Sequence, residues 1–424
     1  MKQSKFKETE IGKIPEDWNV KEIGDVCHLV RDSFSPSKED SRAYIGLEHI
    51  EQNTLRLISI GSSKNINSNK LVFRKGQILF GKLRPYFRKV YRPNFEGVCS
   101  TDIFVIDANK KFDNWFLFYF FADRRMIEEA TLSSEGTRMP RASWKYLEKL
   151  QRGFPDLSEQ KAIAKILSDL DSKIELNQKI NKTLESIGQE LFKHWFVDFE
   201  FPNDEGKPYR SSGGKMVESE LGEIPKGWRV NVFSEVVGVN PKRSLPKGVL
   251  AKKISMADLI PWQSWVVHYE IVNYDSGPKF ISGDTLLARI TPSLEHGKTA
   301  IVSLLEEREV GFGSTEFIVM APQEITSCYY IFYLARSREV RDFAIGSMTG
   351  TSGRQRVPSD CFDYLKIIVP PEDFIHRYHN IATPIFDKIT ANSWQSRELE
   401  SMRDSLLPRL MSGRIRVPIG DTAI

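Results

Sequence analysis

Cysteine is scarce in this chain, and long apolar runs are missing from it. The four cysteines among its 424 residues lie far apart and form no Cys-x-x-Cys pair. This spacing predicts neither a disulfide framework nor a zinc site, and it suits a reducing cytoplasm. The most apolar stretch, residues 115–121, is far shorter than the roughly 20 residues of a membrane helix. The amino terminus, MKQSKFKETE, lacks the apolar centre of a signal peptide. We therefore expect a cytoplasmic protein with no membrane span.

A strong excess of one charge is also missing. Charged residues make up 27% of the chain, but the formal net charge is only +4. Any affinity for nucleic acid must therefore come from local clusters of basic residues. The hydrophobic content of 40% is enough to give two or three domains a packed core at this length.

The chain contains an internal repeat. The opening segment EIGKIPEDWNV at 10–20 returns as ELGEIPKGWRV at 220–230. Two further pairs follow in the same order: FRKGQILFGKLRP (73–85) with FISGDTLLARITP (280–292), and GVCSTDIFVI (97–106) with GFGSTEFIVM (311–320). A repeat of this kind predicts two copies of one structural unit. The alternative is a gene duplication whose copies have no paired function.

Each half has the pattern of a mixed α/β domain. Short β-branched and aromatic runs between residues 44 and 106 are separated by glycines and predict strands, and residues 113–130 predict a helix. The fold class we expect is α/β, with two mixed domains in tandem joined by two long helices. The predicted division is 1–155 first domain, 156–200 central helical region, 201–219 linker, 220–371 second domain and 372–415 distal helical region.

Two apolar stripes with helical spacing follow the two domains. The first consists of Ile163, Ile166, Leu170, Ile174, Ile180, Leu184, Ile187 and Leu191, and Asn177 interrupts it. The second consists of Ile381, Ile385, Phe386, Ile389, Leu399, Met402 and Leu406. An antiparallel coiled-coil-like pair would bury both stripes and place the domains near opposite ends under a pseudo-twofold axis. The alternative is that each helix packs on its own domain. Pro384 predicts a break or kink in the second helix.

Motifs for DNA chemistry are missing. The chain has neither the glycine-rich cofactor loop nor the Asp/Asn-Pro-Pro-aromatic motif of an adenine methyltransferase. Asp156, Glu159 and Lys161 could form a nuclease site, but their position predicts the acidic start of a helix. Gly213-Gly214-Lys215 lacks the earlier glycine of a phosphate-binding loop. His376 and His379 have no third metal ligand at a suitable spacing. We expect no catalytic residue, no metal and no cofactor.

The chain resembles the specificity subunit of Type I restriction-modification systems. The resemblance rests on the two opening segments, on YIGLEHI (44–50), on LSEQKAIAKILSDLDSKIELNQKI (157–180), on LFKHWFVDFEF (191–201) and on LLPRLMSGRI (406–415), and it covers nearly the whole chain. It implies two target-recognition domains, each reading one half of a split site in double-stranded DNA. It also implies helices that set the gap and dock two modification (methyltransferase) subunits, with restriction subunits joining through the complex. Two rival classes are a self-contained DNA-modifying enzyme and a protein-interaction scaffold without DNA contact.

The candidate DNA contacts lie in loops rich in basic residues. Residues 74–92 carry seven Lys or Arg and no acid, interleaved with aromatics, which predicts either a DNA-binding hairpin or a solvated one. The polar loops 133–141 and 347–358 form a second matched pair, in which Arg138 and Arg356 correspond. The predicted contacts are Lys82, Arg84, Arg88, Lys89, Arg138, Arg289, Thr291, Lys298, Arg354 and Arg356.

The end of the central helix carries the candidate contacts to other subunits. Leu191, Trp195 and Phe196 form an apolar cluster there. Such a cluster predicts either a docking site for the modification subunit or part of a domain core.

Overall fold

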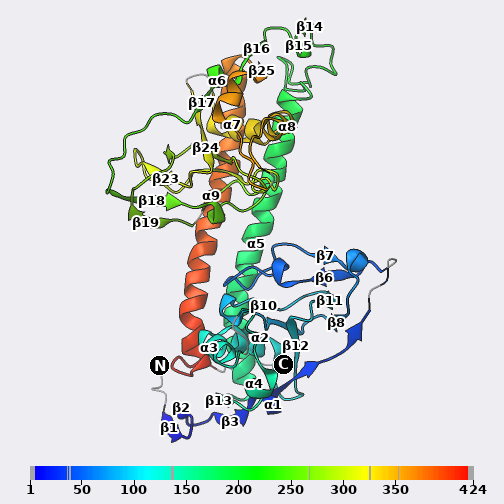
Figure 1. Ribbon diagram of the computed structural model, residues 1–424, viewed down its shortest axis with the longest axis vertical. Coiled ribbons are helices and arrows are strands. Elements are labelled where there is room, and N and C mark those ends of the chain that lie inside the picture. The colour runs from blue at the N-terminus through cyan, green and yellow to red at the C-terminus, as the bar shows by residue number, and fades with distance from the viewer. Residues whose placement is uncertain are drawn as a thin grey trace. The chain divides into compact units, whose positions relative to one another are not determined.

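A computed structural model describes residues 5–35, 37, 40–134, 138–266, 268–323, 326–351 and 353–418. The chain forms two compact units (Figure 1). Unit 1 consists of Met1–Ile174 with Glu398–Ile424, and unit 2 is Glu175–Arg397. Both long helices therefore contribute to both units, which differs from the five-part division expected from the sequence. Residues 201–219, expected to be a linker, contribute a strand and the buried Phe201 to unit 2.

Unit 1 is a mixed α/β structure. Its strands are β1 (Phe6–Thr9), β2 (Gly12–Pro15), β3 (Asn19–Glu22), β4 (Cys27–Val30), β5 (Ser33–Phe34), β6 (Ala43–Ile45), β7 (Gly61–Ser62), β8 (Lys70–Phe73), β9 (Ile78–Gly81), β10 (Val90–Tyr91), β11 (Gly97–Cys99), β12 (Ile103–Ala108) and β13 (Gln151–Phe154). Its shorter helices are α1 (Ile23–Val26), η1 (Leu47–His49), η2 (Ser63–Asn65), η3 (Pro85–Phe87), α2 (Asn114–Ala122), α3 (Arg124–Leu132) and α4 (Trp144–Leu147).

Unit 2 contains a second set of elements in the same order. Its strands are β14 (Met216–Ser219), β15 (Gly222–Pro225), β16 (Arg229–Val232), β17 (Val237–Val239), β18 (Leu250–Ile254), β19 (Glu270–Asn273), β20 (Lys279–Phe280), β21 (Thr285–Ala288), β22 (Thr299–Ile301), β23 (Gly311–Gly313), β24 (Phe317–Pro322) and β25 (Lys366–Val369). Its shorter helices are α6 (Phe233–Val236), η4 (Met256–Asp258), α7 (Cys328–Arg336), α8 (Arg338–Gly346) and η5 (Ser359–Asp363).

The sheets of the two units have the same strand order. The sheet β10-β9-β12-β4 of unit 1 matches β22-β21-β24-β17 of unit 2. The second sheet, β8-β11-β6-β7 with β5 added at its edge, matches β20-β23-β18-β19. In both units this second sheet contains one parallel pair, β11 with β6 and β23 with β18. The sequence repeat thus corresponds to a repeated topology, and the expected α/β class is confirmed.

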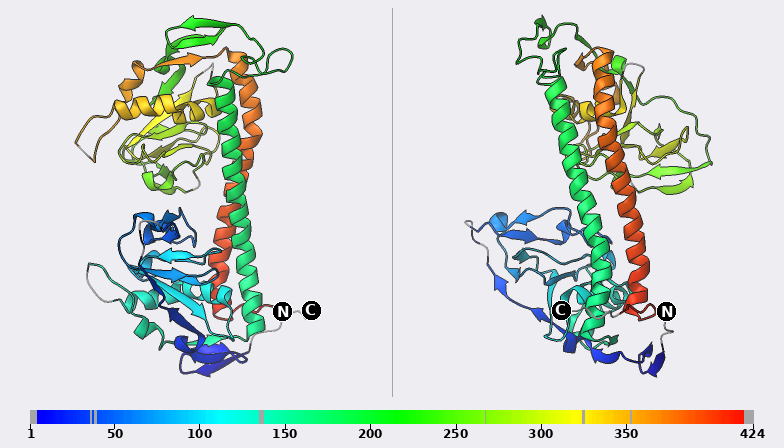
Figure 2. Two further views of the ribbon diagram at one scale, coloured as in Figure 1. Left: turned by 90° about the vertical axis from the view of Figure 1, so that its right-hand side faces the viewer. Right: turned by 180° about the vertical axis from the view of Figure 1, so that it is seen from behind.

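The long helices are α5 (Leu157–Phe196) and α9 (Glu372–Met411), each of 40 residues (Figures 1 and 2). Within each unit they pair antiparallel. In unit 2, Asn181 on α5 contacts Asn392 on α9, while farther along α5 the Gly188 carbonyl accepts from the Tyr378 hydroxyl. In unit 1, Asp171 on α5 pairs with Arg403 on α9. The predicted antiparallel pairing is confirmed.

Of the break or kink expected at Pro384, the break is wrong, because α9 is continuous through this residue. A proline leaves the carbonyl four residues earlier without its helical donor, here that of Asn380. Both Pro384 and Asn380 are exposed, so water can take the place of the missing donor. The buried Ala382, Phe386 and Ile389 hold the opposite face of the helix in the core.

The helix expected at 113–130 is in fact two helices, α2 and α3. Asp123 separates them with an extended backbone (ψ 138), and its side chain accepts a hydrogen bond from the Arg125 amide. Such a side-chain cap satisfies an amide at the start of the second helix. Ser337 does the same between α7 and α8. The sequence pattern alone did not reveal this cap.

The buried face of the long helices is more polar than the predicted stripes. Ile166 and Ile187 on α5 and Ile381 and Met402 on α9 are exposed, contrary to expectation. A polar layer takes part of the interface in unit 2, made of Asn177, Asn181, Asn392, Ser393, Gln395 and Ser396. Buried asparagines can make such pairs only in one alignment of the helices.

Candidate nucleic-acid interface

Three loops of unit 1 are joined by backbone hydrogen bonds at one end of a sheet. The Lys82 amide donates to the Asp102 carbonyl (2.9 Å), and the Ala142 amide donates to the Lys82 carbonyl (2.9 Å). The Arg84 amide donates to the Pro140 carbonyl (2.8 Å). The loop after β9, the turn before β12 and the loop after α3 therefore form one continuous surface, which we call the loop cluster of unit 1.

Unit 2 repeats this loop cluster. The Arg289 amide donates to the Glu316 carbonyl (2.9 Å), the Val357 amide to the Arg289 carbonyl (2.8 Å), and the Thr291 amide to the Gln355 carbonyl (3.0 Å). The hydrogen bonds make Lys82 equivalent to Arg289 and Arg84 equivalent to Thr291, as the repeat predicted.

The expected correspondence of Arg138 with Arg356 is wrong by three residues, since Arg356 takes the place of Arg141. Arg141 binds Asp102 through Nε–Oδ1 (2.8 Å) and Nη2–Oδ2 (3.4 Å). Arg356 binds Glu316 through Nε and Nη2, at 2.9 and 2.7 Å. The hydrogen bond to each carboxylate raises the pKa of its arginine further. In each unit this bidentate pair clamps one loop of the cluster to another.

Four of the predicted contacts are exposed, and one of them, Arg356, is engaged in the ion pair with Glu316. Arg84 is exposed at a left-handed position (φ +51) and its Nη2 lies 3.5 Å from the Arg138 carbonyl. Arg138 and Arg354 are exposed as well. These guanidinium groups lie in the loop clusters, and the hydrogen bond from Arg84 to the Arg138 carbonyl is long.

Three others are partly buried. The Lys82 ammonium lies over the Phe104 ring, 5.4 Å from its centroid. Arg289 has a buried Nε for which no hydrogen-bond partner exists among the described residues. The Thr291 hydroxyl accepts from the Gln355 amide (3.2 Å). These three side chains are therefore partly enclosed within the loop clusters.

Arg88 is buried, contrary to the expectation that it contacts DNA. Its Nε donates to the Ala122 carbonyl (2.7 Å), Nη1 to the Asn53 carbonyl (3.3 Å), and Nη2 to the Asp404 carboxylate (3.3 Å). Burial lowers the pKa of Arg88, opposed by the charge of Asp404. The side chain therefore ties the loop to α2 and α9, and its guanidinium is not free for DNA.

Lys89 and Lys298 form a matched pair of internal contacts. The Lys89 ammonium donates to the Leu47 carbonyl of η1, and that of Lys298 donates to the Met256 carbonyl of η4 (2.7 Å). Partial burial lowers the pKa of both lysines. Both were expected at the DNA, but in this structure each holds a 3-10 helix against its loop cluster.

The candidate docking residues lie in the core of unit 2. Trp195 and Phe196 are buried against Tyr378, at ring-centroid distances of 6.1 and 5.1 Å, and Leu191 is half-buried beside them. Their side chains are thus engaged within the unit. Leu176 and Ile187, both half exposed, are large apolar side chains that α5 leaves open in unit 2.

The acidic start of α5 has a structural role. Asp156 accepts from the Glu159 amide (2.9 Å), which lowers the pKa of Asp156. The buried Glu159 accepts from the Trp18 indole (3.0 Å) and pairs with Arg416 (2.8 Å). The helix-start interpretation of these acids therefore agrees with the geometry. Among the described residues no group of three His, Cys, Asp or Glu could hold a metal ion.

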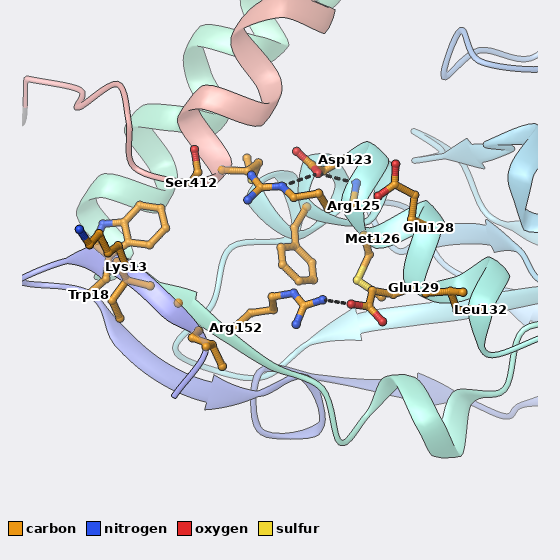
Figure 3. A pocket seen from close by; sticks show the side chains of 15 residues that line it. Lys13, Trp18, Asp123, Arg125, Met126, Glu128, Glu129, Leu132, Arg152 and Ser412 are labelled. Carbon is orange, nitrogen blue, oxygen red and sulfur yellow. Dashed lines mark hydrogen bonds and ion pairs between the residues drawn. The ribbon is translucent and has the colours of Figure 1, made fainter. Parts of the chain in front are cut away.

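A pocket of about 390 Å³ lies in unit 1 between β2, α3 and the end of α9 (Figure 3). Its wall contains apolar side chains such as Trp18 and Met126. The Arg152 guanidinium in it pairs with Glu129 (2.7 Å). In unit 2 the positions that match Arg152 and Glu129 carry Ile367 and Phe343, which pack in the core.

No described helix is long and apolar enough to cross a membrane.

The architecture is that of a tandem protein in which two copies of one α/β unit carry equivalent loop clusters on a shared pair of helices. The sequence model of the Type I restriction modification DNA specificity domain matches residues 15–186. The chain is 26% identical to the Type I restriction enzyme MjaIX specificity subunit of Methanocaldococcus jannaschii, over 98% of this chain and 97% of that protein. It is 23% identical to the HindI specificity subunit of Haemophilus influenzae, over 94% of this chain and 100% of that protein.

A solved structure has the same fold. The crystal structure of the Type I restriction-modification system S subunit from M. genitalium aligns with a TM-score of 0.51 at 14% identity, over 96% of this chain and 98% of that one. The chain is therefore similar over nearly its whole length to Type I restriction-modification specificity subunits, and its residues 15–186 match the model of their DNA specificity domain.

Proposed function

We propose that this chain is the DNA sequence-specificity subunit of a Type I restriction-modification complex and that each unit reads one half of a bipartite, asymmetric site. The observation that carries the proposal is the repeated loop cluster. Its backbone hydrogen bonds are the same in both units, while the side chains at equivalent places differ, as Arg84 and Thr291 do. Two loop clusters that share a backbone arrangement but carry different side chains are suited to reading two different base sequences.

The recognition domains of this proposal are residues 1–155 and 220–371. Arg84, Arg138 and Arg354 supply exposed charge for phosphates and guanine edges, and Lys82, Arg289 and Thr291 are partly enclosed within the same loop clusters. Arg88, Lys89, Lys298 and Arg356 position the loops, because their side chains are held by internal contacts.

The helices α5 and α9 set the gap between the half-sites and dock two modification subunits in this proposal, and restriction subunits join through the complex. Exposed apolar side chains on a helix favour a protein partner. Leu176 and Ile187 therefore replace Leu191, Trp195 and Phe196 as the docking residues that we propose.

The central experiment exchanges residues 25–150 for those of a relative with a different target. The modification complex is expressed in cells that lack other adenine methylation, and methylated adenines are mapped across the genome. We expect one half of the methylated site to change and the other half to stay. A change in both halves, or in neither, contradicts the proposal.

The absence of catalysis in the isolated chain is part of the same proposal. The purified chain, incubated with DNA and S-adenosylmethionine or with magnesium, is expected to show no turnover. Methyl transfer or cleavage by the chain alone would favour the rival class of a self-contained enzyme.

A further inference from the structure

Asn53 and Trp262 occupy equivalent places beside the two loop clusters. Both have a left-handed backbone, with φ of +65 and +63. The Asn53 amide donates to the Phe87 carbonyl (3.3 Å), and the Trp262 amide donates to the Gly297 carbonyl (3.1 Å), which lies one position later in the matching loop. The same sequence offset that relates Lys89 to Lys298 relates Asn53 to Trp262.

The carbonyl groups of these two residues are held in the same way. That of Asn53 accepts from Nη1 of Arg88 (3.3 Å), and that of Trp262 accepts from Nη2 of Arg336 (3.1 Å). Both arginine side chains are buried, and each lies near a carboxylate of a long helix in its own unit. Both backbone polar groups of each residue are therefore tied, which offsets the cost of the left-handed conformation.

The two arginines come from different places in the chain. Arg88 lies in the loop after β9, and its Nε reaches the carbonyl of Ala122 at the end of α2. In unit 2 the place of Ala122 at the end of α7 is taken by Arg336, and the place of Arg88 is taken by Gly297. The arginine comes from the loop after β9 in unit 1 and from the end of α7 in unit 2, but in both units it donates to the carbonyl of a left-handed residue. The backbone site is thus common to both units although the residues that build it differ.

The side chains on this common backbone are different, and both residues are exposed, Trp262 by about half. The Trp262 indole is 47% exposed, and the Arg341 and Arg336 guanidinium carbons lie 4.5 and 5.6 Å from its ring centroid. A Cβ at Gly297 would come within 2.6 Å of the indole, so the glycine leaves room for the ring. Asn53 is exposed, and among the described residues no hydrogen-bond partner exists for its carboxamide.

We infer that Asn53 and Trp262 are matched specificity-determining positions, one for each half of the DNA site. The inference rests on the proposed function and deepens it. A carboxamide pairs with the N6 and N7 edge of adenine, whereas an indole packs against a thymine methyl group, a base or a deoxyribose. The hydrogen-bonded backbone at this position is common to both units, while the exposed side chain differs. Each unit can therefore discriminate different bases.

The test uses the complete modification complex with Asn53→Ala, Trp262→Ala or Trp262→Phe in the specificity chain. Methylated adenines are mapped genome-wide in cells that lack other adenine methylation. Asn53→Ala is expected to reduce methylation of the cognate site about tenfold and to relax one base position in one half only. Trp262→Ala is expected to do so in the other half, and Trp262→Phe to a smaller extent. Asn94→Ala and Tyr364→Ala, which remove exposed side chains of similar type from the same units, are expected to leave the pattern unchanged.

An unchanged methylation pattern in both alanine variants overturns the inference, and so does an equal loss at all sequences. Melting temperatures are measured for every variant, and if Trp262→Ala does not fold, the base preference of Trp262→Phe decides. Failure of the proposed function has a different signature, because then the wild-type complex itself would methylate no split site.

Discussion

The basic residues of the loop clusters differ in what holds their side chains. Arg84 and Arg138 are exposed, whereas Arg88 is buried among two backbone carbonyls and the Asp404 carboxylate. Lys89 lies one residue from Arg88 and holds η1. The basic loops therefore carry both side chains that are exposed to solvent and side chains that hold neighbouring segments in place, and only the packing of each side chain distinguishes the two kinds.

Because the buried arginine comes from a different segment in each unit, moving it within unit 1 is expected to restore stability that is lost when Arg88 is removed. Arg88→Gly leaves the Ala122 and Asn53 carbonyls without their arginine donor and leaves Asp404 with Arg403 as its remaining partner, and we expect the free energy of unfolding of unit 1 to fall by about 3 kcal/mol. Adding Ala122→Arg copies the arrangement of unit 2 and is expected to restore part of that loss. Urea unfolding measures both effects. A double variant no more stable than Arg88→Gly would show that the two arrangements are not interchangeable.

Among the larger elements, the helix pair combines apolar packing with a polar layer. The Asn392 amide donates to the Asn181 carboxamide oxygen (2.9 Å), and Asn181 donates to the Ser393 hydroxyl (3.1 Å). The layer lies where the sequence has an interruption of its apolar stripe at Asn177. It costs hydrophobic burial but selects one register of α5 against α9 in unit 2.

Asn392→Leu tests the polar layer. The substitution removes the donor to the buried Asn181 oxygen, and we expect the free energy of unfolding to fall by about 1–3 kcal/mol. Lys388→Ala, at an exposed position of the same helix, serves as the control and is expected to change stability little. Equal stability of Asn392→Leu and wild type in urea unfolding would mean that the layer adds nothing to the pair.

The segment after α9 returns to β2 and β3 and gives unit 1 a pH-dependent contact. Arg416 binds Asp17 (2.9 Å from Nη1) and Glu159, and its hydrogen bond lowers the pKa of Asp17. A lowered pKa means that the contact stabilises the fold above the ordinary Asp value and is lost as pH falls through the lowered pKa.

Asp17→Asn is therefore expected to lower the melting temperature at pH 7. The difference from wild type should begin to shrink as pH falls below about 4, where Asp17 of the unfolded chain takes up a proton, and should vanish as pH falls through the lowered pKa of the folded protein. Thermal unfolding from pH 3 to pH 7 measures this. A difference that stays constant over the whole range would show that the Asp17 charge does not matter.

At the scale of the whole molecule, the small net charge of +4 conceals a local arrangement of basic loops. Cations bound to phosphates release counterions from DNA, so binding should weaken as salt rises. The exposed Arg84 of unit 1 and Arg354 of unit 2 are the side chains best placed to contribute.

Arg84→Ala and Arg354→Ala are each expected to reduce the slope of log K against log salt by about one. Fluorescence anisotropy with the cognate duplex, titrated at several salt concentrations, gives the slope. Lys226→Ala removes an exposed charge from the turn that follows β15, and it should leave the slope as it is. Unchanged slopes in both arginine variants would place the phosphate contacts elsewhere.

The repeat, the α/β class and the two long helices could be predicted from the amino-acid sequence alone, because they depend on short segments and on periodic apolar positions. The sequence also located the loops of the clusters, since Ser-Thr-Asp and Ser-Thr-Glu mark equivalent turns at 100–102 and 314–316. The prediction of a single helix at 113–130 was wrong because one side chain determines the local structure there. Asp123 ends one helix and caps the next.

Which basic residues face solvent, and which residues of the two units are equivalent, depends on the tertiary structure. Arg356 matches Arg141 and not Arg138, because a strand-like contact and an ion pair set the alignment of that loop. Asn53 and Trp262 have no similarity in sequence, yet their backbones are held alike by arginines that come from opposite sides of the contact. Long-range hydrogen bonds create that equivalence, and they join residues whose separation along the chain leaves no local pattern to read.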